Sequence, residues 1–297
     1  MNSRSLAQLA AHPHGFQTGT KDRPGRLILR NVLEHEVAQF THILLAPENH
    51  NYPGAQAGLA NMSEDIIRYN LFKKDEKTER RVIDLFIILK PGLEDSLKLP
   101  FQRVRHIVNG GHVIGIVTLV LDQHPHNPSD CGAYTGIIIH HEARGHRFGK
   151  EAYIAVLDYV LLGHPTTLRD GNLGGLGLPN VHIETAEANK AFIKLMEQLH
   201  LSHLQREATP DHGQDYRMKV PCVNWTVTKP VWLEARKHVR LDWMPEGQQT
   251  LSRDGSPDLQ ELEHGDASGS GHASGSGHVT SIGHIAANQR FAYGSYK

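Results

Sequence analysis

The sequence predicts an α/β protein that consists of one folded domain followed by a low-complexity tail. Two β-branched runs, Arg81–Lys90 and His112–Leu121, are typical of central strands. A helical period of apolar residues, seen over Glu34–Leu45, alternates with such runs along the chain. Beyond about Leu251 a Ser-Gly-Ser-Gly-His unit repeats, and too few apolar residues remain to bury a core. We therefore expect strands and helices before this point and disorder after it.

The other elements follow from local signals. Arg26–Leu33 alternates apolar and polar residues as a strand does. Ser63, followed by two acidic residues, predicts the N-cap of a helix that continues through Tyr69 and Phe72. Three later segments are expected to form a flexible Gly-rich loop, a final strand and a short helix: Gly163–Pro179, Tyr216–Val220 and Val231–Val239.

Composition narrows the classes of function. A formal net charge of −1 gives no reason to expect nucleic acid or an anionic membrane as the main partner. Cys131 and Cys222 are too few for a disulfide framework, so we expect an intracellular, cytoplasmic protein. No signal peptide and no transmembrane run is evident in this sequence. Four tail histidines could bind a transition metal: His264, His272, His278 and His284. They lack the Cys or carboxylate spacing of a metal centre, so a solvated tail is favoured and no metal site is predicted.

The segment Tyr134–Ala152 is the most informative part of the chain. It runs as an apolar strand, a short basic turn with glycines, and the first turns of a helix. Such a turn leaves backbone N–H groups at the positive end of the helix dipole, where a phosphate or pyrophosphate binds well. Basic side chains add charge and two glycines allow close approach; these residues are Arg144, Gly145, His146, Arg147, Gly149 and Lys150. The sequence thus predicts a site for a phosphorylated ligand.

These residues match a family pattern. Arg144–Gly149 resembles the acyl-CoA pyrophosphate loop of the GNAT N-acetyltransferases, written Q/R-x-x-G-x-G/A, and Gly136–Ile139 resembles the strand before it. A second block, the strand Val181–Glu184 followed by Asn189 and the helix Lys190–Leu199, is similar to an element of the branch that acetylates ribosomal-protein N-termini and related amines. The resemblance covers roughly residues 25–220.

The resemblance implies a fold and a reaction. The fold would be a mixed, mostly antiparallel sheet that is splayed at the cofactor strand, with helices on both faces. The enzyme would be an N-acetyltransferase that moves an acetyl group from acetyl-CoA directly to the amine of a small molecule or protein. The chain would then divide into a flexible leader, an acetyltransferase domain, an extension and the tail, at residues 1–24, 25–220, 221–250 and 251–297.

The resemblance also implies site residues. The cofactor would be held by the strand, the loop and the entry to the next helix, at Ile137, Ile138, Ile139, Arg144, Gly145, His146, Arg147, Phe148, Gly149, Lys150 and Asn189. The N–H of Ile139 would polarise the thioester carbonyl. Glu184 would act as the base that deprotonates the amine through water, with Tyr134 as a second acid–base candidate. Three structural alternatives stay open: Asn189 as an ordinary N-cap, Glu184 as the partner of an arginine, and Tyr134 as a packing residue.

The chain departs from the family pattern at several positions. Arg147 stands where a second glycine is usual, Phe192 replaces a small or hydroxyl residue, and Met196 occupies the place of a frequent tyrosine acid. His200 and Leu201 replace a Gly-aromatic pair. These departures suggest a second hypothesis, a non-catalytic acyl-CoA-binding or protein-interaction module on the same fold. A Gly-loop nucleotide-binding protein is disfavoured because neither G-x-x-x-x-G-K-[ST] nor a G-x-G-x-x-G after a strand is present.

Overall fold

The structure is a computed structural model, and it describes part of the chain. The described residues are 15–19, 24–49, 62–72, 81–93, 97, 106–108, 110–122, 132–163, 175–208 and 221–240. The expected tail, its histidines and the suggested strand Tyr216–Val220 lie outside these residues.

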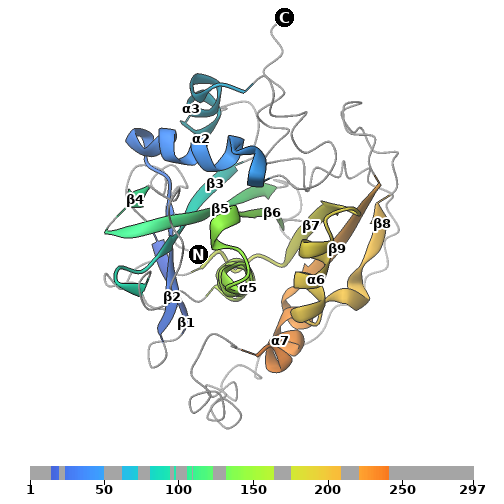
Figure 1. The fold of residues 1–297 in the computed structure, drawn as a ribbon. Coiled ribbons are helices and arrows are strands. Elements are labelled where there is room, and N and C mark those ends of the chain that lie inside the picture. Colours follow the sequence, from blue (N-terminus) through green and yellow to red (C-terminus); the bar gives the residue numbers. More distant parts are fainter. Residues whose placement is uncertain are drawn as a thin grey trace, which may run out of the picture.

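A sheet of nine strands forms the centre of the described fold (Figure 1). Its strands are β1 Gly15–Gly19, β2 Pro24–Asn31, β3 Arg81–Leu89, β4 Ile107–Val108, β5 Gly111–Asp122, β6 Gly132–Ile139, β7 Asn180–Ala186, β8 Arg206–Ala208 and β9 Cys222–Thr228. Their order is β1-β2-β3-β5-β6-β7-β9-β8, and β4 pairs with β5. Every pair is antiparallel except β6 with β7, which is parallel. The sheet is therefore mixed and mostly antiparallel.

Helices cover both faces of the sheet. The α-helices are α2 Val37–Leu45, α3 Glu64–Phe72, α5 Phe148–Leu157, α6 Lys190–Gln198 and α7 Lys229–His238. A π-helical turn, η6 Asp158–Leu162, continues α5, and short 3₁₀ turns are η1 Glu34–Glu36, η2 Pro47–Asn49, η5 His141–Ala143 and η7 Ser202–Leu204. In Figure 1, α2 and α3 lie on one side of the sheet, while α5 lies on the other.

The strands divide most of the core into two large clusters because successive side chains point to opposite faces. On β3, Leu85 and Ile87 pack into the cluster that contains α5, α6 and α7. Phe86 and Ile88 pack into the cluster that contains α2 and α3. All four side chains are at most 4% exposed, and burying such a side chain contributes roughly 1.5–3 kcal/mol to stability. Each strand residue can thus be assigned to one of two faces of the sheet. We call the face covered by α5 the α5 face, and the face covered by α2 and α3 the α2–α3 face.

A buried polar network fixes the start of α5 against β1 and β2. The carboxylate of Glu151 is fully buried and accepts hydrogen bonds from the Thr18 hydroxyl, from the Arg26 backbone N–H at 2.6 Å and from Arg26 Nε at 2.8 Å. The Arg26 guanidinium also lies 4.5 Å from the centre of the Phe148 ring. Contacts with β1 and β2 therefore fix the position of the first turn of α5.

Strands β6 and β7 separate after a short contact. They pair only where Gly132–Tyr134 meets Asn180–His182. In contrast, β6 pairs with β5 along its whole length, from Gly132 to Ile139. The splay therefore opens on the β7 side of β6, next to the N-terminus of α5.

Two expected boundaries differ from the structure. Strand β1 lies within residues 1–24, which we expected to be a flexible leader. Strand β9 pairs with β7 over seven residues, so the sheet continues past residue 220. The expected short helix is present as α7, and its Trp232 is fully buried. Among the described residues, no helix has both the length and the apolar character needed to span a membrane.

Candidate functional site

A cavity of about 560 Å³ lies at the splay between β6 and β7. Its volume falls within the usual range of small-ligand sites. The described residues that line it come from η2, β5, β6, the turn before α5, α5 itself and α6: Asn49, Ile116, Thr118, Gly136, Ile137, Ile138, Ile139, Ala143, Arg144, Gly145, Arg147, Phe148, Gly149, Lys150, Asn189, Ala191, Phe192, Lys194, Leu195 and Gln198. Because Thr118 and Ile137 lie on opposite faces of the sheet, the cavity extends through the splay.

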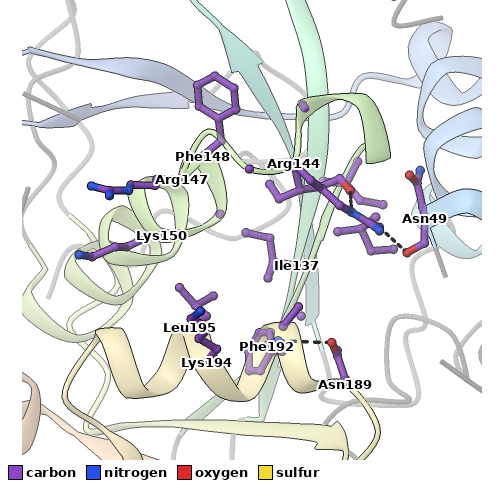
Figure 2. Close-up of a pocket in the computed structure, with 18 of the residues that line it drawn as sticks. Asn49, Ile137, Arg144, Arg147, Phe148, Lys150, Asn189, Phe192, Lys194 and Leu195 are labelled. Carbon is purple, nitrogen blue, oxygen red and sulfur yellow. Dashed lines mark hydrogen bonds between the residues drawn. The ribbon is translucent and has the colours of Figure 1, made fainter. Parts of the chain in front are cut away.

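One end of the cavity is cationic. Figure 2 shows Arg147 and Lys150 together on one side, at the start of α5, while Asn49 lies at the opposite side. Arg147 is the N-cap of α5, and its backbone is left-handed with φ 62°. Gly145 also has a positive φ, 86°, a conformation that favours glycine. Since the first N–H groups of an α-helix have no partner within the helix, this end suits an anion.

The edge of β6 that faces the splay offers backbone groups to a ligand. A Cβ added at Gly115 would come within 2.4 Å of the Ile138 carbonyl, so that carbonyl points toward β5. Consecutive residues of a strand alternate in direction, so the N–H and C=O groups of Ile137 and Ile139 face the splay. An extended ligand could pair with this edge as a further strand would.

Arg144 contributes to the site mainly by shaping the turn. Its Nε donates to the carbonyl of Ile139 at 3.1 Å, and a terminal nitrogen donates to the carbonyl of Asn49 at 2.8 Å. Burial lowers the pKa of its guanidinium. His146 is not among the described lining residues: its ring lies 5.7 Å from that of Phe148, and its carbonyl accepts from Arg26. The other nine residues expected to bind the cofactor all line the cavity, as Arg144 does.

Asn189 is the N-cap of α6, and its contact with the cofactor stays a prediction. Its side-chain oxygen accepts from the Phe192 N–H at 3.3 Å and so caps α6, as Figure 2 shows. The same residue also lines the cavity. The departures Phe192 and Met196 lie in the core: Phe192 is 6% exposed and Met196 is fully buried. Met196 therefore fills space between α6 and the sheet and offers no proton donor.

Glu184 lies near the splay but is not among the described lining residues of the cavity. Its neighbour Ile183 packs in the cluster that contains α5, so the Glu184 side chain points to the other face of the sheet. Burial raises the pKa of Glu184 to about 7, against a smaller, opposite effect of a hydrogen bond with the Cys222 side chain. Burial and the Glu184 carboxylate together raise the pKa of Cys222 to about 11. Glu184 is thus a carboxyl that exchanges its proton near neutral pH.

Tyr134 lies on the same face as Glu184 and is 6% exposed. Its ring centre is 5.0 Å from that of His182, and it packs with Val120 and Val82. It does not appear among the described residues around the cavity. Of the neighbouring histidines, His140 is buried, and this burial together with the adjacent His141 lowers its pKa to about 4. His140 is therefore neutral at pH 7.

Sequence reasoning missed several lining residues, among them Asn49, Thr118, Gly136 and Lys194. Two of them carried a signal. Thr118 is the only hydroxyl in the apolar run His112–Leu121, and Gly136 interrupts a strand that otherwise favours β-branched residues. Asn49 and Lys194 carried none, because their place in the cavity depends on how α2 and α6 pack.

Comparisons with known proteins agree with this arrangement. A family profile described as "Acetyltransferase (GNAT) domain" matches residues 26–202, which is more than half of the chain. The mixed sheet with helices on both faces is the fold that the resemblance predicted, and this prediction is confirmed.

The chain is also similar to solved structures. One is a chimera of the spermidine N-acetyltransferase from Vibrio cholerae, with 14% identity over 70% of this chain and 99% of that chain and a TM-score of 0.46. Another is an acetyltransferase of the GNAT family from Bacillus anthracis, with 10% identity over 73% and 99% of the two chains and a TM-score of 0.44. No curated protein matches.

Proposed function

The chain belongs to the GNAT acetyltransferase family, and we propose that it transfers an acetyl group from acetyl-CoA directly to a primary amine. One observation carries the proposal: the cavity joins a length of the β6 edge that pairs with no described strand to a cationic helix N-terminus. An acyl-CoA has a matching order of parts, because its amide-containing arm lies between the acyl thioester and the phosphates.

The residues present fit acetyl-CoA. The start of α5, with Arg147 and Lys150, would hold the pyrophosphate, since hydrogen bonds to a charged group contribute roughly 1.5–3 kcal/mol each. The splay-facing groups of Ile137 would pair with the arm, and the N–H of Ile139 would be directed at the thioester oxygen, while the Ile139 carbonyl keeps its hydrogen bond from Arg144. When bound, acetyl-CoA supplies the acetyl group to be transferred.

The amine must lose a proton before or during attack. Glu184 supports this step because its pKa of about 7 leaves it partly ionised at neutral pH, poised to accept a proton. Since Glu184 lies outside the described cavity wall, the proton would reach it through a water molecule. Tyr134 is the second candidate for this role. With Met196 in the core, we expect the leaving thiolate to take its proton from solvent.

The acceptor belongs to the same proposal. The block from Val181 to Asn189 is similar to the branch that acetylates protein N-termini and related amines. The cavity's reach through the sheet would let such an amine approach from the α2–α3 face while acetyl-CoA lies on the α5 face. We infer an amine of a small molecule or an exposed protein N-terminus as the acceptor.

A two-stage experiment tests the proposal. Calorimetry should show binding of acetyl-CoA but not of ATP. A thiol-release assay should then detect transfer to at least one member of a panel of small primary amines and peptides with free N-termini. Binding without transfer to any amine would instead support a non-catalytic acyl-CoA-binding module. Preference for ATP would refute both.

A further inference from the structure

Gly136 differs from the other strand glycines of the described residues. At Gly15, Gly25, Gly111, Gly115 and Gly132, an added Cβ would lie within 2.6 Å of another atom, so packing alone requires glycine there. At Gly136 an added Cβ would meet nothing within 4 Å. Its φ is not positive either, so the backbone would accept any residue. Glycine in a strand lowers stability and often marks a close approach by a ligand.

The open space at Gly136 lies on the α2–α3 face, inside the cavity and at the splay. Gly136 lines the cavity, and its neighbours two residues away, Tyr134 and Ile138, belong to clusters on that face. The register Tyr134↔His182 would bring Gly136 opposite Glu184 if the two strands stayed paired. They separate there, so Gly136 and Glu184 stand on the two sides of the gap.

On its other side, Gly136 is paired with Thr118, a buried hydroxyl in the cavity wall. Thr118 is paired in turn with Asp84 on β3, and its hydroxyl donates a hydrogen bond to Asp84 Oδ1 at 2.5 Å. A hydroxyl has one proton, so Thr118 can only accept hydrogen bonds from a molecule in the cavity. An amine or ammonium nitrogen, which carries N–H donors, is the complementary group.

We propose that Gly136, Thr118 and Asp84, which are paired across β6, β5 and β3, form the acceptor subsite. The carbon next to the acceptor's nitrogen lies over Gly136, and the N–H of the acceptor donates a hydrogen bond to Thr118 Oγ1. Asp84 holds the Thr118 hydroxyl in the accepting orientation. Thr118 is a positioning residue, and Gly136 sets the width available to the acceptor. The inference rests on the proposed amine acetylation, and it adds the residues that select and orient the acceptor.

A graded series of variants tests the subsite, with the wild type's best amine from the thiol-release panel as the probe. Gly136→Ala, Gly136→Val and Gly136→Leu should raise the amine KM progressively, by about tenfold or more for Leu. Calorimetry should give an unchanged Kd for acetyl-CoA in all three. Thr118→Val should raise the amine KM by about tenfold, as expected for one lost hydrogen bond. Thr118→Ser keeps the hydroxyl and should therefore keep the wild-type amine KM.

Each outcome distinguishes the subsite from the reaction. An active wild type whose amine KM is unchanged in Gly136→Leu and in Thr118→Val would refute the subsite and leave the proposed function standing. Weaker acetyl-CoA binding in Gly136→Ala would assign the space to the donor and also refute the subsite. A wild type that acetylates no amine would refute the proposed function, and the subsite with it. If the Leu variant does not fold, the Ala and Val variants decide.

Discussion

Replacing Glu184 by glutamine should separate the proton-transfer chemistry of the site from acetyl-CoA binding. The substitution keeps the shape of the side chain and removes its ability to take a proton. The turnover rate should fall by roughly 10²–10⁴-fold, the usual contribution of a general base. The acetyl-CoA Kd should not change, since Glu184 is not among the described residues that line the cavity.

The pH dependence follows from the pKa of about 7. In the wild type, about a tenth of Glu184 is ionised at pH 6 and about half at pH 7, so turnover should rise through this range and level off above pH 8. The glutamine variant should lose this rise. The measurement is a pH–rate profile from pH 5 to 9 under saturating acetyl-CoA and amine.

Stability should change in the opposite direction with pH. Because the folded pKa of Glu184 is raised above its ordinary value of 4.5, its contribution to the free energy of unfolding is fully present below about pH 4.5 and is lost as the pH rises through about 7. The change corresponds to about 3 kcal/mol. Denaturant unfolding at pH 5 and pH 8 should show a loss in the wild type that the glutamine variant lacks.

A matched control is Glu187→Gln, which makes the same charge change at an exposed position three residues further on. It should keep the wild-type rate and pH profile. If Glu184→Gln also keeps near-normal turnover with an intact acidic limb, Glu184 is not the base, and Tyr134 or solvent must take the proton. If the variant fails to fold at pH 7, the carboxyl is instead a structural group.

Three further substitutions test the site from other directions. Cys222→Ala removes a hydrogen bond that lowers the pKa of Glu184, so the acidic limb of the pH–rate profile should move to higher pH; movement to lower pH would contradict this. Arg147→Gly relieves a left-handed backbone at φ 62° and should raise the free energy of unfolding by about 1 kcal/mol. Calorimetry should show weaker acetyl-CoA binding by this variant because a positive charge is lost. Equal or tighter binding would place the phosphates elsewhere. Glu151→Ala leaves Arg26, only 15% exposed, without its buried partner, so chemical denaturation should show a loss of about 3–5 kcal/mol, and a loss below 1 kcal/mol would mean that the network is not stabilising.

Gly149→Val tests whether the loop before α5 holds the phosphates of acetyl-CoA. The positive φ values lie at Gly145 and Arg147, and Gly149 is already within α5. An added Cβ there would contact only Ile139, at 3.5 Å, so the protein itself can accommodate it. The valine would instead take up cavity space next to the helix N-terminus and should weaken acetyl-CoA binding at least tenfold. Unchanged binding by calorimetry would refute the loop assignment.

Local signals predicted the elements that are continuous in sequence. The β-branched runs became β3 and β5 with ends within one residue of the expected ones. The Ser63 hydroxyl accepts from the Ile66 N–H at the start of α3, as its N-cap pattern predicted. Strand β1, with the sequence GFQTG, was missed because it has too few apolar residues to show a period. Strand β9 does alternate, with Val223, Trp225 and Val227 buried, and was predictable from that pattern.

The candidate site was predictable only where it follows the chain. The loop before α5 gathers at the cavity because its residues are consecutive. Thr118 and Gly136 meet through the register of β5 with β6, and Asp84 joins them through the register of β3 with β5. Register depends on tertiary packing between strands that are distant in sequence, and no local pattern encodes it.

Strand β9 gives the molecule an order of assembly during synthesis. The ribosome releases β7 and α6 before β9, yet β9 pairs with all seven residues of β7. Pairing between strands that are distant in sequence is slow, so β7 lacks its β9 partner until Cys222–Thr228 has emerged and paired with it. A fragment that stops at residue 202, where the family match ends, would contain every described residue of the cavity wall. In this fragment Glu184 would lack both its strand partner β9 and its hydrogen bond with the Cys222 side chain.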